Sequence, residues 1–202
     1  MELLTHVDLS AARDRCAGVQ ITLASDVDSP LLGLRGTTNL HGPDKGVAAA
    51  RLVHVDAQLE RLVAVTDRRS AMGQGAGAGG GLGFALLLLG GERIDGVKLV
   101  ADAVGLQALA RSADLVVTGE GAFDFSSRSG KVPYGVAKIA GEAIRPCIAL
   151  AGQVLVGSRE MRALGIESAY AVMDLTGRDA AFAEPAASLS TLAERVARTW
   201  SR

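Results

Sequence analysis

The second half of the chain repeats one pattern, a short apolar run followed by turn residues and a helical stretch, and this pattern constrains the fold most. The apolar runs are Leu115–Val117, Ile148–Leu150 and Ala169–Val172. Strands and helices joined in this order by short connections are typical of a parallel sheet with crossover helices. We therefore expect an α/β fold in which residues 113–202 form half of a doubly wound domain.

Residues 1–112 are predicted to form a separate, glycine-rich unit. Alternating apolar and polar residues over 19–23 predict a half-buried strand, and helical periodicity predicts an amphipathic helix over about 47–65. The strongest shift in composition is Gly73–Gly81, which runs directly into Leu82–Leu89. The uniform apolarity of Leu82–Leu89 predicts a fully buried helix.

Charge and composition exclude several classes of protein. The 21 basic and 22 acidic residues leave a net charge of −1, which argues against a nucleic-acid binder and against an anchor to anionic membranes. Cys16 and Cys147 lie far apart without a CxxC spacing, which argues against a disulfide scaffold or a structural zinc site. The start lacks the features of a signal peptide, and no apolar run approaches the ~20 residues that span a bilayer. We expect a soluble, cytoplasmic protein.

The glycine-rich segment is the first candidate for binding phosphate. Gly75, Gly77 and Gly80 formally satisfy GxGxxG, but the residues upstream read as a helix where the dinucleotide fingerprint requires a strand. Backbone N–H groups of such a loop, followed by a helix, suit an anion. The alternative is a flexible turn, or close packing through small residues.

A second candidate loop, Thr118–Asp124, follows the predicted strand at 115–117. Ligands of open α/β sheets bind beyond the carboxyl ends of the strands. Glu120 and Asp124, with Gly119 and Gly121, are therefore placed to hold Mg²⁺ or a sugar-like hydroxyl. The alternative is a strand-ending turn with solvated acids.

A third candidate, Ser126–Pro133, leads into a predicted helix. It is not a Walker A loop, because Phe125 stands at the position of the first glycine and Val132 follows Lys131. A lysine at the start of a helix is electrostatically unfavourable unless an anion binds there, although surface lysines near turns are common.

Two carboxylates, Asp26 and Asp28, follow the predicted strand at 19–23. Alternation along an extended strand places both on one side, where they can share a cation or where one can act as a base toward a hydroxyl. A turn around Ser29 and Pro30 is the structural alternative. Lys45, in a loop two residues after Pro43, is uninformative by itself.

Four ordered segments, spread over about 110 residues, carry a further signal. They are Asp26–Gly33, Gly42–Gly46, Gly75–Gly83 and Asp114–Gly121, the last followed by Asp124, Gly130, Lys131 and Pro133. In order and spacing they resemble the bacterial glycerate kinase type-1 family, and the resemblance covers essentially the whole chain. Members of that family are nearly twice as long, so the chain resembles their C-terminal half. The family usually carries Asn at Ser29, an aromatic residue at His41, Gln at Asp44 and often Arg at Ala122.

The resemblance implies a fold of two α/β domains, a Rossmann-like one built from both chain ends and a second one inserted in it. Residues 1–112 would then be a portion of the inserted domain, and 113–202 the C-terminal portion of the Rossmann-like domain. It also implies ATP-dependent phosphorylation of D-glycerate, with 2-phosphoglycerate as the product, and hence ATP and Mg²⁺ as cofactors. A homo-oligomer, or a separate polypeptide that supplies the N-terminal half, would be its partner.

Roles for individual residues follow from the same resemblance. Asp26 would be the base or orient the substrate, while Glu120 and Asp124 would lie near Mg²⁺ or the glycerate hydroxyls. Lys45 and Lys131 would neutralise phosphate or the glycerate carboxylate. Glycines would line the anion, namely Gly75, Gly77, Gly79, Gly80, Gly119 and Gly121. The alternative to an enzyme is a non-catalytic remnant, or a small-molecule binding module of the same fold.

Overall fold

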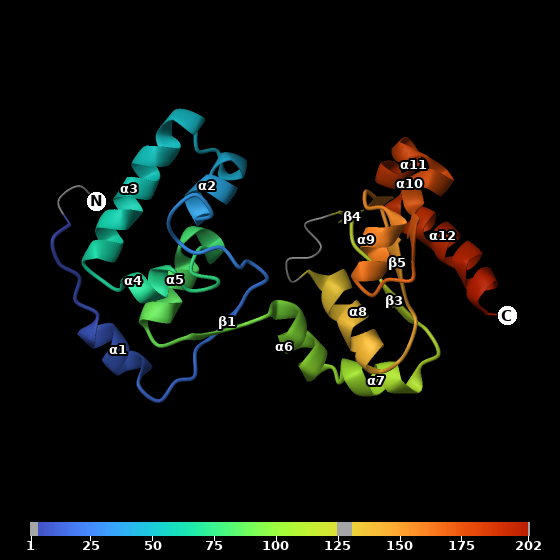
Figure 1. Cartoon of the computed structure of the whole chain (residues 1–202), viewed down its shortest axis with the longest axis horizontal. Coiled ribbons are helices and arrows are strands. Elements are labelled where there is room, and N and C mark those ends of the chain that lie inside the picture. The colour runs from blue at the N-terminus through green and yellow to red at the C-terminus, as the bar shows by residue number, and fades with distance from the viewer. Residues whose placement is uncertain (1–3, 125–130, 202) are drawn as a thin grey trace. The chain divides into compact units, whose positions relative to one another are not determined.

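The computed structural model describes residues 4–124 and 131–201. The chain divides into two compact units, residues 1–96 and 97–202 (Figure 1). Composition alone indicated a change after residue 112, whereas helices α6 (Gly96–Ala103) and α7 (Leu106–Ser112) fall at the start of the second unit. The assignment of residues 1–112 and 113–202 to two domains of the family stays a prediction.

The first unit is mainly helical, with one pair of short parallel strands. Its helices are α1 (Ser10–Cys16), α2 (Thr37–His41), α3 (Leu52–Ala64), α4 (Arg68–Ala71) and α5 (Leu82–Leu88), with 3-10 turns η1 (Pro43–Lys45), η2 (Ala49–Arg51) and η3 (Ala78–Gly80). Strand β1 (Thr22–Ala24) pairs with β2 (Glu92–Ile94), and Leu23 lies opposite Arg93. The strand predicted over 19–23 therefore forms slightly later, and the helix predicted over about 47–65 is η2 followed by α3.

The core of the first unit gathers between α3, α4 and α5. Its buried side chains are Leu31, Leu32, Val63, Ala71, Ala76, Phe84 and Leu88. The prediction that Leu82–Leu89 form a fully buried helix is wrong, because α5 packs on one face only: Phe84 and Leu88 are buried, whereas Leu82 is 62% exposed. Leu31 donates its backbone N–H to Ala71 O at 2.8 Å, which ties the segment after β1 to this core.

The second unit is a three-layered α/β structure. Its strands are β3 (Val116–Thr118), β4 (Ala122–Phe123), β5 (Cys147–Ala151), β6 (Gln153–Val154) and β7 (Ser168–Ala171). Its remaining helices are α8 (Val132–Glu142), α9 (Ser158–Ala163), α10 (Val172–Thr176), α11 (Arg178–Ala183) and α12 (Pro185–Trp200). The sheet has the order β3-β5-β7 and is parallel throughout, and β4 and β6 form a second parallel pair. The predicted parallel sheet with crossover helices is confirmed.

Helices cover both faces of the sheet (Figure 1). One face packs on α8 and α9 through Phe123, Ala140, Ala149 and Ile166. The other face packs on the C-terminal helices through Ile148, Leu192 and Val196. Sheets buried on both faces consist of nearly continuous apolar strands, which explains why these three strands were visible in the sequence. Within the described ranges, no helix combines the length and apolarity needed to cross a lipid bilayer.

Candidate functional site

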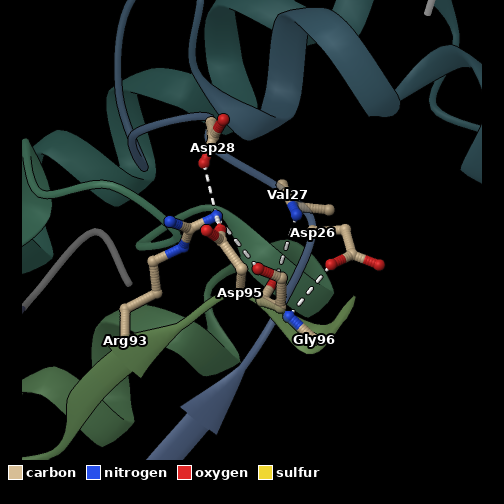
Figure 2. Close-up of polar contacts among 7 residues, drawn as sticks. Asp26, Val27, Asp28, Arg93, Asp95 and Gly96 are labelled. Carbon is tan, nitrogen blue, oxygen red and sulfur yellow. Dashed lines mark hydrogen bonds and ion pairs between the residues drawn. The ribbon is translucent and has the colours of Figure 1, made fainter. Parts of the chain in front are cut away.

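Residues 25–30, which we call the acidic loop, follow β1 directly and carry Asp26 and Asp28. Asp26 Oδ1 accepts a hydrogen bond from the backbone N–H of Gly96 at 3.0 Å, and Gly96 follows the end of β2 (Figure 2). Val27 donates its N–H to Ser25 Oγ at 3.1 Å. The acidic loop is thus fixed at the carboxyl ends of two parallel strands, the edge of a sheet where ligands bind in α/β proteins.

The two carboxylates are held by different partners. Asp28 Oδ1 lies 2.6 Å from Arg93 Nη2, while Asp26 is bound to Gly96. The prediction that alternation in a strand places both carboxylates on one side is therefore wrong, because β1 ends at Ala24 and both residues lie in the loop beyond it. Contacts with residues of β2 and of the segment after it, and not strand geometry, fix the two carboxylates.

Arg93 is the functional candidate that the sequence analysis missed. Its Nη2 lies 2.6 Å from both Asp28 Oδ1 and Asp95 Oδ1, and it also donates to Ser25 O at 3.0 Å (Figure 2). The Arg93 side chain is 15% exposed, whereas both carboxylates are about half exposed. A strand prediction over Glu92–Ile94 would have placed Arg93 beside the acidic loop, but three residues with two charges give little strand signal.

The glycine loop, residues 73–81, lies against the acidic loop. Gly77 donates its N–H to Ser29 O at 2.9 Å. A β-carbon on Gly77 would lie 2.6 Å from Pro30 O, and one on Gly75 would lie 3.2 Å from Arg93 Cγ. The structure therefore brings Gly75 and Gly77 together with the residues that follow β1.

Most of the N–H groups between 75 and 81 donate within the protein. The donors with such backbone partners are Ala76, Gly77, Ala78, Gly80 and Gly81. Close packing is also evident at the start of α5, where a β-carbon on Gly83 would lie 2.0 Å from Gly75 O. These contacts favour the packing interpretation for Gly75 and Gly77. Anion binding by Gly79 and Gly80, which are both exposed, stays a prediction.

Ser29 occupies the contact between the two loops. The side chain is buried, at 8% exposure, and its Oγ has no hydrogen-bond partner among the described residues. Buried hydroxyl groups ordinarily form hydrogen bonds. The unpaired Ser29 Oγ can therefore bond to a further polar group at this contact.

In the second unit, residues 119–121 form a loop that directly follows the end of β3 at Thr118. Glu120 O and Gly121 O accept hydrogen bonds from Gly152 and Gln153, which dock this loop on the end of β5. Gly119 is required there, because a β-carbon would lie 2.2 Å from Leu150 O. The loop thus takes the position beyond a parallel strand that was expected for it.

A cavity of about 940 Å³ opens beside this loop. Thr118, Glu120 and Gly121 line one part of it, and apolar side chains including Leu150, Val172 and Phe182 line the rest. Its size is at the upper end of the range for small-molecule sites.

The other predicted site residues are distributed as follows. Asp124 directly follows β4, and Lys131 is the residue before α8, so both lie in the second unit, as Glu120 does. Residues 125–130, which contain most of the third candidate loop, lie outside the described residues. Lys45 is exposed at the end of η1, in the first unit.

The described residues limit how the chain can bind a metal ion and whether a cysteine can act as a nucleophile. In residues 4–124 and 131–201, no three His, Cys, Asp or Glu side chains gather in a way that could hold a metal ion by themselves. This arrangement still suits Mg²⁺, which is commonly held by one or two carboxylates together with substrate phosphates. Burial raises the pKa of the Cys147 thiol to about 11, so it stays protonated and is no nucleophile at neutral pH.

Comparisons with known proteins identify the family. The model of the glycerate kinase family matches residues 1–201. The chain is 34% identical to "Glycerate kinase" of Halalkalibacterium halodurans, over 84% of this chain and 46% of the relative. It is 32% identical to "Glycerate 2-kinase" of Escherichia coli, over 88% of this chain and 48% of the relative.

A solved structure agrees with these relatives. A Salmonella typhimurium protein assigned as glycerate kinase 2 superposes with a TM-score of 0.69 at 32% identity, over 99% of this chain and 53% of that one. The chain spans about half the length of the relatives that it matches. The match nevertheless extends over nearly every residue of this chain, and the chain belongs to the glycerate kinase family.

Proposed function

We propose that this chain contributes to the ATP-dependent phosphorylation of D-glycerate, with 2-phosphoglycerate as the product. Membership of the family supports the reaction, and the name of the Escherichia coli relative, a glycerate 2-kinase, supports the position of the phosphate. The observation that carries the proposal is the anchored carboxylate of Asp26, which lies at the carboxyl end of a strand pair.

Asp26 is proposed as the base. Its Oδ1 is occupied by the Gly96 N–H, and its second oxygen points away from Gly96 (Figure 2). That oxygen would accept the proton of the glycerate hydroxyl as the hydroxyl oxygen forms its bond to the γ-phosphorus of ATP. The bond from that phosphorus to the bridging oxygen breaks at the same time, and ADP leaves with the electron pair.

Glu120 and Asp124 are proposed to hold Mg²⁺, which neutralises charge on the phosphates when it is bound. Both carboxylates are partly buried, Glu120 in the loop after β3 and Asp124 directly after β4, and one or two carboxylates are enough to hold a hard cation that keeps several water ligands. Lys131, at the start of α8, would pair with a phosphate or with the glycerate carboxylate. The largely apolar cavity beside Glu120 suits the adenine of ATP better than a three-carbon acid.

The proposal includes partners and location. D-glycerate and ATP are small polar metabolites of the cytoplasm, where we place the protein. A second polypeptide, corresponding to the remaining half of the relatives, would complete the enzyme; the alternative partner is a second copy of the chain in a homo-oligomer. The competing hypothesis is a non-catalytic remnant that binds small molecules without turning them over.

The test is Asp26→Asn in a preparation that releases ADP from ATP and D-glycerate. The Asn carbonyl still accepts the Gly96 N–H, so the variant removes the charge and keeps the anchor. We expect kcat to fall by about 100-fold or more with little change in the KM for glycerate. Asp14→Asn, an exposed carboxylate on α1, is the matched control and should leave both constants unchanged.

Two results would contradict the proposed function. A change in KM alone would make Asp26 a binding group and not the base. Absence of ADP release, both from the chain alone and from the chain supplemented with the missing half of a relative, would favour the non-catalytic remnant.

A further inference from the structure

Arg93 contacts three separate segments of the first unit. Its Nη2 bridges Asp28 of the acidic loop and Asp95 after β2, at 2.6 Å each. Its aliphatic stem passes the glycine loop, where a β-carbon on Gly75 would lie 3.2 Å from Arg93 Cγ and 3.5 Å from Cδ. A single side chain therefore joins the acidic loop, the glycine loop and the end of β2.

The charges at this junction do not balance without Arg93. Asp28 and Asp95 approach the same nitrogen, so their carboxylates are close enough to repel each other when the cation is removed. The guanidinium is mostly shielded from solvent, and its Nε is buried with no hydrogen-bond partner among the described residues. The polar contacts of the guanidinium among the described residues are therefore made by Nη2, which contacts the two carboxylates and Ser25 O.

The two carboxylates flank the hydrogen bond that fixes Asp26. Asp28 lies two residues after Asp26, and Asp95 directly precedes Gly96, whose N–H binds Asp26 Oδ1. Holding Asp28 and Asp95 on one nitrogen thus fixes both chain segments that form the Asp26–Gly96 hydrogen bond (Figure 2).

We propose that Arg93 is a positioning residue, which holds the Asp26 carboxylate through the Asp28 and Asp95 ion pairs. The inference rests on the proposed function only in taking Asp26 as the base. The competing explanation is mechanical: the stem of Arg93 packs on Gly75, and the charge has no part in positioning Asp26.

Two substitutions separate charge from packing. Arg93→Met retains an unbranched stem over Gly75 and removes the cation. Arg93→Lys retains a positive charge near both carboxylates. Arg68→Met is the matched control in the same unit, since Arg68 forms a 2.6 Å ion pair with Glu60 but is 70% exposed.

The first readout is the hydrogen-exchange rate of the Gly96 amide in the 202-residue chain, which needs no catalytic activity. We expect Arg93→Met to raise this rate by about tenfold or more, because the Gly96 hydrogen bond to a charged group opens. Arg93→Lys should restore most of the protection of the Gly96 amide. Arg68→Met should leave the exchange rate within about twofold of the wild type, because an exposed ion pair contributes little to stability.

The second readout is kinetic, in a preparation that phosphorylates glycerate. Arg93→Met should lower kcat far more than it raises the KM for glycerate, and Arg93→Lys should recover much of kcat. If no phosphorylation is found, that result counts against the proposed function and not against the positioning role of Arg93. The exchange rate of the Gly96 amide tests the positioning role without any catalytic activity.

Equal Gly96 exchange in Arg93→Met and the wild type would overturn the positioning role. Loss of protection in both Arg93→Met and Arg93→Lys would likewise assign the effect to the shape of the arginine and reject the charge-based proposal. If Arg93→Met does not fold, Arg93→Met with Asp95→Asn removes one uncompensated charge and carries the same test: rapid Gly96 exchange supports the proposal, and wild-type protection overturns it.

Discussion

The backbones of Gly77 and Ser29 are in direct contact, because Gly77 donates its N–H to Ser29 O at 2.9 Å and has no side chain to keep the two loops apart. A β-carbon on Gly77 would lie 2.6 Å from both Ser29 Oγ and Pro30 O. This contact ties the acidic loop to the glycine loop, which lies far from β1 in the sequence. The glycine loop thus has a structural role that is independent of any ligand.

Gly77→Ala is therefore expected to destabilise the first unit. Backbone atoms would have to move to admit the methyl group, and overpacking of this kind costs about 1–3 kcal/mol. Urea unfolding followed by circular dichroism measures the loss. Gly141→Ala is the control, since Gly141 lies in α8 with open space around it, and alanine there should stabilise by about 0.5–1 kcal/mol. Equal stability of Gly77→Ala and the wild type would refute the close contact.

Cys147 provides a prediction about pH. Its folded pKa is raised to about 11 from an ordinary value of 9.0, because burial disfavours the thiolate. Below pH 9 both the folded and unfolded chains keep the proton. Between pH 9 and 11 the unfolded chain releases it more readily, so this group's contribution to stability is lost as the pH rises.

The measurement compares urea midpoints at pH 7.5 and pH 10 for the wild type and Cys147→Ala. The wild type should lose more stability over this interval than the variant does. A thiol reagent at pH 8 should modify Cys16, which is partly exposed, and should reach Cys147 only on unfolding. Rapid modification of Cys147 in the folded Cys16→Ser protein would contradict its burial.

Lys131 provides a prediction about anion binding. If it contacts a transferring phosphate or the glycerate carboxylate, Lys131→Ala should lower kcat/KM by at least ~100-fold, since such a contact is worth ~2.7–4 kcal/mol. Lys138→Ala, which removes an exposed lysine from the same helix α8, should leave turnover unchanged. Turnover within twofold of the wild type in Lys131→Ala would make Lys131 an ordinary surface lysine.

The sequence predicted the second unit better than the first, for a physical reason. Strands β3, β5 and β7 lie between two helical layers and contribute apolar side chains to both, so each is an apolar run that is visible in the sequence. Strand β2 has three residues, two of them charged, and its partner β1 lies far away in the sequence. Because β2 gave no signal, neither Arg93 nor Asp95 was placed beside Asp26.

The amino-acid types alone also left two structural questions open, and the packing of the folded chain answers them. The glycines between 75 and 81 were compatible with anion binding and with close packing, and the internal N–H donors and the Gly77 contact now favour packing for part of the loop. The apolar run at 82–89 gave no indication of which side faces solvent, since leucines occupy every face of α5.

Strand β3 is the basis of the last prediction, because it has a neighbour on one side only among the described residues. Val117 is 53% exposed, whereas Ile148, its register partner on β5, is 1% exposed. Parallel strands are ordinarily buried on both faces, and a bare edge promotes association. The relatives are about twice as long, so we expect their remaining half to cover this edge and complete the active cleft.

The purified 202-residue chain should therefore not turn over glycerate by itself, and it should self-associate or be of low stability. ADP release would be assayed with D-glycerate, ATP and Mg²⁺, for the chain alone and mixed with the N-terminal half of a related kinase. Activity that appears only on mixing would support a shared site. Turnover by the chain alone at the ~1–100 s⁻¹ usual for kinases would reject the prediction and place every essential group within these residues.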